Sequence, residues 1–265
     1  NYFAVNVGEV ERILQSMEKP LVRWGTSLQK IQYRHNYLLH DLLVHRFTAT
    51  IEQVHIARQN VAAARDLHSP FQLAEYLSSL GFIAFMAEDF EQSKQAYMES
   101  LAVAETHHLF NIIERCYAYL SLVYRRQKQP DQASGILELL TKILELTNLR
   151  TYVMLVAAQR AWLAYLSGDI ETARSQAEEA LKGWGQEKMP YPMQWAGRMI
   201  LLALEVQAQH WEQAGEQAQA LLQRGQQRLS PAMASALQTA LDWGEQEAPG
   251  RWQEAVATAR HEGYL

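Results

Sequence analysis

Segments of similar character recur along this chain at a nearly constant spacing. Residues 84–101 read AFMAEDFEQSKQAYMESL and residues 164–181 read AYLSGDIETARSQAEEAL, so these two segments start 80 residues apart. Equivalent positions lie between and beyond them at steps of 40 or 41 residues: Gln53, Ser93, Ala133, Ala173, Ala214 and Ala255. A fixed period of this length indicates a stack of similar units, because one such unit cannot bury its apolar face alone.

Each period contains two stretches with the spacing of an amphipathic helix. In the best-formed copy, Leu77, Leu80 and Ala84 recur at three- and four-residue steps and so share one helix face. A short acidic turn follows, and Ser93 and Tyr97 begin a second stripe. Small residues at the positions equivalent to Ser93 would allow two helix backbones to approach closely. The unit is therefore predicted to be a helical hairpin.

Two helix starts are marked by a serine followed by a proline. These are Ser69-Pro70 and Ser230-Pro231. Serine at the N-cap accepts a hydrogen bond from an otherwise unpaired backbone N–H, and proline at the first helical position has no N–H to satisfy. Ser69 and Gln72 also have the spacing of a capping box.

The composition favours helices over strands. Only 13 of the 265 residues are Gly and 7 are Pro, so residues that interrupt helices are scarce. We expect an all-α fold, a right-handed α-solenoid of antiparallel helix pairs. Residues 1–33 are predicted to be a partial repeat whose first helix would precede Asn1, and residues 34–265 to be six repeats. Their predicted bounds are 34–73, 74–113, 114–153, 154–194, 195–235 and 236–265.

The repeat resembles the tetratricopeptide repeat (TPR). Residues 77–84, LSSLGFIA, match the first half of its consensus, and Ala173, Ala177 and Ala180 match the small positions of the second half. The resemblance covers residues 34–265, but the consensus unit has about 34 residues, and these units have 40 or 41. The longer form is similar to repeats in MalT-like transcription activators and in the sensor ends of STAND ATPases. That resemblance implies a solenoid that binds an inducer or a protein and controls an upstream ATPase or DNA-binding domain.

A helical solenoid usually binds its partners on the concave face lined by the first helix of each unit. Helix phase places arginine, aromatic and amide side chains there: Arg46, Phe82, Arg115, Tyr119, Arg126, Gln159 and Trp162. Arginine beside aromatic rings suits peptide carboxylates, phosphate-bearing ligands or planar rings. In the alternative interpretation Phe82 and Trp162 pack between helices, and the arginines pair with Glu75 or Glu114.

The sequence contains no signature of catalysis or of a cofactor. It has no GxxxxGK[ST], HExxH or GxSxG motif. Cys116 is the single cysteine and the nine histidines form no ligand spacing, so we expect no metal site. A net charge of −5 argues against nucleic-acid binding. No run approaches the roughly 18 apolar residues of a membrane span, and a lone cysteine fits a reducing, cytoplasmic compartment.

We therefore expect a non-catalytic binding module, the regulatory or sensor C-terminal part of a larger bacterial signalling or transcription-regulating protein. Its partner would be a protein or a peptide, with a small anionic inducer as a second candidate. The alternative is a free-standing TPR scaffold that mediates protein assembly, or self-association through the open ends of the solenoid. A P-loop domain encoded upstream would favour the first hypothesis, and a complete protein of about this length would favour the second.

Overall fold

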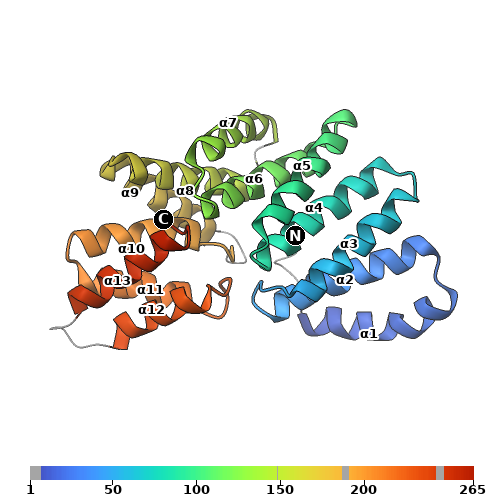
Figure 1. Ribbon diagram of the computed structural model, residues 1–265, viewed down its shortest axis with the longest axis horizontal. Coiled ribbons are helices and arrows are strands. Elements are labelled where there is room, and N and C mark those ends of the chain that lie inside the picture. The colour runs from blue at the N-terminus through green and yellow to red at the C-terminus, as the bar shows by residue number, and fades with distance from the viewer. Residues whose placement is uncertain (1–6, 148, 187–190, 243–247) are drawn as a thin grey trace. The chain divides into compact units, whose positions relative to one another are not determined.

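The computed structural model describes residues 7–147, 149–186, 191–242 and 248–265, and all the regular structure in these ranges is helical (Figure 1). The thirteen described helices follow one another along the chain. They are α1 (Val7–Trp24), α2 (Ser27–Val44), α3 (Ile51–Arg65), α4 (Pro70–Met86), α5 (Phe90–Thr106), α6 (Phe110–Arg126), α7 (Pro130–Thr147), α8 (Arg150–Ser167), α9 (Ile170–Gly185), α10 (Trp195–Gln207), α11 (Trp211–Leu222), α12 (Pro231–Asp242) and α13 (Ala248–His261). The predicted all-α solenoid of helix pairs is confirmed.

The helices form two compact units, Asn1–Val123 and Tyr124–Leu265, here called unit 1 and unit 2. Helix α6 contributes to both, because the division falls near its C-terminal end. Within unit 1, α2 packs on α1 and α3, and α4 packs on α3 and α5. Within unit 2, α8 packs on α7 and α9, and α10 packs on α8, α9, α11 and α13.

The 40-residue period is visible in the backbone of the turns. Glu88, Lys128, Gly168 and Gln209 lie between the two helices of successive hairpins, and all four have left-handed backbone angles, with φ between 57° and 81°. The first and third of these turns are each followed by an aspartate, and Asp89 and Asp169 both cap the next helix by accepting a hydrogen bond from a backbone N–H. The turns thus repeat the same conformation although only Gly168 is the residue that this conformation favours.

The small residues that define the period are buried where helices cross. Ser93, Ala133, Ala173 and Ala214 are all completely buried, and each is the fourth residue of its helix. The Ser93 hydroxyl donates to the carbonyl of Gly81 at 2.8 Å, so α4 and α5 are in close contact there. Helices α3 and α13 depart from this register.

The predicted helix starts are present. Ser69 and Ser230 accept hydrogen bonds from the backbone N–H groups of Gln72 and Met233, and Pro70 and Pro231 are the first helical residues. Complete capping boxes occur instead at the starts of α2 and α3, which are capped by Thr26 and Thr50. The predicted repeat divisions fall inside α2, α4, α6, α8 and α12, whereas the division at 194/195 coincides with the start of α10. None of the described helices is long and apolar enough to cross a membrane.

Candidate peptide-binding site

The seven residues predicted to line a binding face fall into two groups. Arg46, Phe82, Arg115 and Tyr119 belong to unit 1, and Arg126, Gln159 and Trp162 belong to unit 2. Arg46 was predicted to lie on the first helix of its hairpin, which is wrong: α2 ends at Val44, and Arg46 lies in the following turn with φ 55°.

The unit 1 residues form contacts that match the alternative interpretation. The ring of Phe82 meets that of Tyr119 edge to face at 5.0 Å, and Tyr119 stacks on Tyr97. Arg115 forms an ion pair with Glu75, the partner proposed for it in that interpretation. Phe82 and Tyr119 therefore contribute to packing between helices, and the charge of Arg115 is compensated within the unit.

His35 lies close to this ion pair and is almost completely buried. Its ring contacts Tyr76 edge to face at 5.2 Å. Burial lowers the pKa of His35 to about 4, the charge of Glu75 opposes that shift, and the charge of Arg115 adds to it. His35 is therefore neutral in the folded chain at neutral pH.

This buried histidine predicts a loss of stability in mild acid. The unfolded chain binds a proton at His35 below its ordinary pKa of about 6.5, whereas the folded chain binds it only near 4. The contribution of His35 is complete above pH 6.5 and is lost as the pH falls towards 4. It should cost unit 1 about 2 kcal/mol between pH 7 and pH 5.

Urea unfolding followed by circular dichroism at several pH values measures this loss. His35→Leu should flatten the pH dependence, and His55→Leu, at an exposed position on α3, should not change it. Equal pH profiles for the wild type and His35→Leu would contradict the assignment.

In unit 2 the predicted residues surround an arginine that the sequence analysis did not select. Arg125 is completely buried. Its Nη1 donates to Gln159 Oε1 at 3.1 Å and to the carbonyl of Ala196 at 2.8 Å. Its guanidinium lies 5.4 Å from the ring centroid of Trp162 and 5.2 Å from that of Trp195. Burial, and then the charge of neighbouring Arg126, lower the pKa of Arg125.

The remaining donors of Arg125 bind a segment that follows α13. We call residues Glu262–Leu265 the EGYL segment. Nε and Nη2 of Arg125 both donate to the carbonyl of Tyr264, at 3.1 and 2.5 Å. In Figure 1 the end of α13, in red and marked C, lies beside α8 and α10, which carry the other residues that surround Arg125.

The EGYL segment begins with a glycine-dependent turn. The N–H of Tyr264 donates to the carbonyl of Ala259 at 2.8 Å, and the N–H of Gly263 to that of Arg260 at 3.3 Å. This pair of bonds is a Schellman motif. Gly263 has φ 74°, and a Cβ added there would lie 2.4 Å from the carbonyl oxygen of Arg126. Glycine is therefore required both by the backbone angle and by the close approach of α6.

Side chains also hold the segment. Arg126 Nε donates to the carbonyl of Glu262 at 3.0 Å, and its guanidinium lies 4.1 Å from the centroid of the Tyr264 ring. That ring and the ring of Trp195 meet in an edge-to-face arrangement, with 5.2 Å between their centroids. The Tyr264 hydroxyl accepts a hydrogen bond from the backbone N–H of Ser230, and the Ser230 hydroxyl donates to the Glu262 carboxylate. Tyr264 and Leu265 are only 2% and 4% exposed.

These contacts define one site, which we call the arginine site: Arg125, Arg126, Gln159, Trp162, Trp195 and Ser230. Arg126, Gln159 and Trp162 were predicted from helix phase and do lie together. Arg125 and the EGYL segment were not among the residues predicted from helix phase. The available signal was Gly263 followed by two bulky residues after a helix, which is typical of a Schellman motif with an apolar contact.

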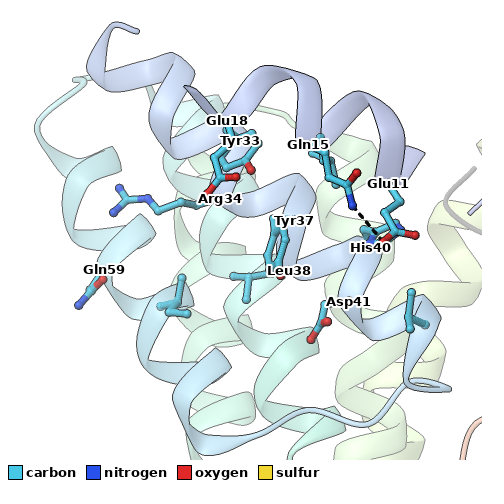
Figure 2. Close-up of a pocket in the computed structure, with 13 residues that line it drawn as sticks. Glu11, Gln15, Glu18, Tyr33, Arg34, Tyr37, Leu38, His40, Asp41 and Gln59 are labelled. Carbon is cyan, nitrogen blue, oxygen red and sulfur yellow. Dashed lines mark hydrogen bonds between the residues drawn. The ribbon is translucent and has the colours of Figure 1, made fainter. Parts of the chain in front are cut away.

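A cavity lies in unit 1 between α1, α2 and α3 (Figure 2). This cavity of about 530 Å³ is lined by thirteen residues, among them Tyr33, Arg34, Tyr37 and Asp41. None of the predicted binding residues lines it. Its polar groups are partly engaged with the protein, since Gln15 donates to Glu11 at 3.2 Å and His40 Nε2 lies 3.2 Å from the carbonyl of Val7.

The described ranges contain no metal-binding cluster. There, no group of three His, Cys, Asp or Glu side chains is placed to hold a metal ion. Burial raises the pKa of the Cys116 thiol to about 11, and its Sγ contacts the Ser100 hydroxyl at 3.4 Å. The thiol is therefore protonated at neutral pH and is a weak nucleophile.

Of the comparisons with known proteins, the one with solved structures supports the fold. No protein-family model and no curated protein matches the sequence. Among solved structures, the chain is similar to BtubC (BKLC) from P. vanneervenii, with a TM-score of 0.56 and 13% sequence identity over 90% of this chain and 92% of that one. Since the identity is low, this likeness shows a shared helical-repeat fold alone.

Proposed function

We propose that this chain is a non-catalytic protein-binding module that receives a short peptide segment at the arginine site. One observation carries the proposal. Arg125 and Arg126 donate to main-chain carbonyl groups of a segment more than 130 residues away in the sequence, and Trp195 and Arg126 cover its aromatic side chain. Hydrogen bonds to the main chain and contacts to selected side chains are one way in which proteins recognise an extended peptide.

The chemistry of Arg125 supports a peptide over a compact anion. Its guanidinium is used as a set of donors spread over three acceptors: an amide oxygen of Gln159 and the carbonyls of Ala196 and Tyr264. All of these acceptors are neutral. A phosphate or carboxylate ligand would call for two parallel bonds from the guanidinium to one charged group.

We further propose that the module is the regulatory or sensor part of a larger bacterial signalling or transcription-regulating protein. Support comes from the 40- or 41-residue period, which is similar to that of MalT-like regulators and STAND sensor domains. In this role, occupation of the arginine site would control an ATPase or DNA-binding domain. The gene sequence upstream of Asn1 tests this role, and we expect it to encode a P-loop domain.

Peptide selection tests the binding function directly. A library of random dodecapeptides displayed in several copies per phage is panned on the immobilised chain, because multivalent display detects weak binding. We expect enrichment of peptides with a common motif. Arg126→Ala should abolish this enrichment with helicity unchanged, because it removes a carbonyl donor and the cation over the ring.

The matched control is Arg160→Ala, since Arg160 is an exposed arginine on α8 that donates to Thr141. It should select the same peptides as the wild type. Equal enrichment on wild type and Arg126→Ala, or no enrichment on either, would refute peptide binding at this site.

A further inference from the structure

We infer that the EGYL segment is a built-in competitor for the arginine site, and that the partner carries a peptide of the same chemistry: an acidic residue, glycine, tyrosine and an aliphatic residue in that order. This inference rests on the proposed function. It names the ligand and the way in which its access is regulated.

The glycine position is the most selective part of this motif. Any other residue at Gly263 would have to adopt a left-handed backbone and would bring its Cβ within 2.4 Å of the Arg126 carbonyl oxygen. A competing peptide must therefore present glycine where its chain passes the end of α6. This requirement is steric and does not depend on how the peptide is connected.

The neighbouring positions are read by side chains. The tyrosine ring contacts the guanidinium of Arg126 and meets the Trp195 ring in an edge-to-face arrangement, and its hydroxyl accepts a hydrogen bond from the Ser230 N–H. The acidic side chain accepts a hydrogen bond from the Ser230 hydroxyl. The final aliphatic residue is buried, with an exposed fraction of 4% at Leu265. Each position thus selects a type of residue.

Arg125 makes an empty arginine site energetically unfavourable. With the segment in place, Nε and Nη2 are satisfied by the Tyr264 carbonyl, and Nη1 is satisfied by Gln159 and Ala196. Removing the segment leaves two charged donors without a protein acceptor beside two tryptophan rings. Unpaired buried donors are costly, so a peptide that restores the carbonyl is favoured.

The segment can leave while its helix stays in place. Helix α13 packs on α10, α11 and α12 through its own length. The EGYL segment follows the last helical residue of α13, His261, and the turn at Gly263 connects the two. Release therefore exchanges one set of local contacts and does not require α13 to unfold.

Competition of this kind weakens the apparent affinity for the partner. The apparent dissociation constant equals the intrinsic constant divided by the fraction of molecules whose site is open. A tethered segment is present at an effective concentration of the order of millimolar. A change that releases the segment should therefore tighten binding of the free peptide by about tenfold or more.

The experiment uses the full chain and a fluorescein-labelled peptide with the sequence of residues 257–265, ATARHEGYL, titrated by fluorescence anisotropy. Gly263→Ala is expected to release the segment and to lower the dissociation constant at least about tenfold relative to the wild type. Gly250→Ala is the matched control, because Gly250 lies in the same helix and an added Cβ meets nothing within 4 Å. It should bind the peptide like the wild type.

Two further arms keep the test decisive. Tyr264→Ala, which removes the ring instead of adding a methyl group, should reproduce the gain if Gly263→Ala does not fold by circular dichroism. A peptide in which glycine is replaced by alanine should not bind any variant. Equal affinity for wild type and both released variants would overturn the competitor role and leave peptide binding intact. If neither released variant binds the ATARHEGYL peptide, the proposed motif is wrong. The phage-display selection then tests the proposed function independently of this motif.

Discussion

Replacing Ala173 by glutamate is expected to lower the free energy of unfolding of unit 2 by about 3 kcal/mol or more. Ala173 is completely buried and is the fourth residue of α9, at the position that defines the 40-residue period. A carboxylate there would have to enter the contact between neighbouring helices or force them apart. Either outcome is costly, because the penalty for an unpaired buried charge exceeds the energy of most single packing contacts.

Denaturant unfolding followed by circular dichroism measures this effect, with Ser175→Glu as the control. Ser175 lies two residues further along α9 and is exposed, so the same charge on the same helix should change the midpoint little. Since the chain forms two units, the transition of unit 2 has to be resolved from that of unit 1. An unchanged curve for Ala173→Glu would show that the repeat register is wrong.

The register could be predicted because it depends on local pattern. Small residues at a fixed step mark places where helices cross closely, and Ser93, Ala133, Ala173 and Ala214 are indeed all buried there. Serine–proline pairs likewise mark helix starts through contacts within one turn. Information of this kind is carried by residues a few positions apart, and it survives without any knowledge of the tertiary fold.

The site could be predicted only in part. Helix phase predicts which face of a helix a residue lies on, but it does not predict which other residue it contacts. Within unit 2, Gln159 and Trp162 contact Arg125, and Arg126 donates to the EGYL segment. Helix phase could not show that Arg115 would be paired with Glu75. The prediction for Arg46 was wrong for a simpler reason. No sequence signal marks the end of α2 at Val44.

Arg125 was not predicted as a site residue because arginine side chains are usually exposed. Arginine is rarely buried completely. An arginine next to Arg126 in the sequence is therefore expected to be exposed to solvent. Its main partner, the carbonyl of Tyr264, is 139 residues away in the sequence. No local pattern encodes a contact over that distance. Gly263 was the single local sign, and it marks a turn without showing where the following residues bind.

Replacing Arg125 by methionine is expected to lower the stability of unit 2 by about 3 kcal/mol, because each buried acceptor left unpaired costs about 1–3 kcal/mol. Methionine fills much of the same volume, so the loss comes from the acceptors left behind: the carbonyls of Ala196 and Tyr264 and the side-chain oxygen of Gln159. Exchange of a buried ion for an apolar residue is tolerated where its partners are exchanged as well. Here two of the three partners are backbone groups, which no single substitution removes.

Arg125→Lys separates the charge from the shape of the guanidinium. Lysine keeps the positive charge, but a single nitrogen cannot reach acceptors on three sides, so this variant should lie between the wild type and Arg125→Met. Arg160→Met removes an exposed arginine and should be nearly neutral. Thermal and denaturant unfolding of the three variants rank these effects. If Arg125→Met proved as stable as the wild type, the converging hydrogen bonds would not hold the EGYL segment, and the arginine site would have to be abandoned as a peptide receptor.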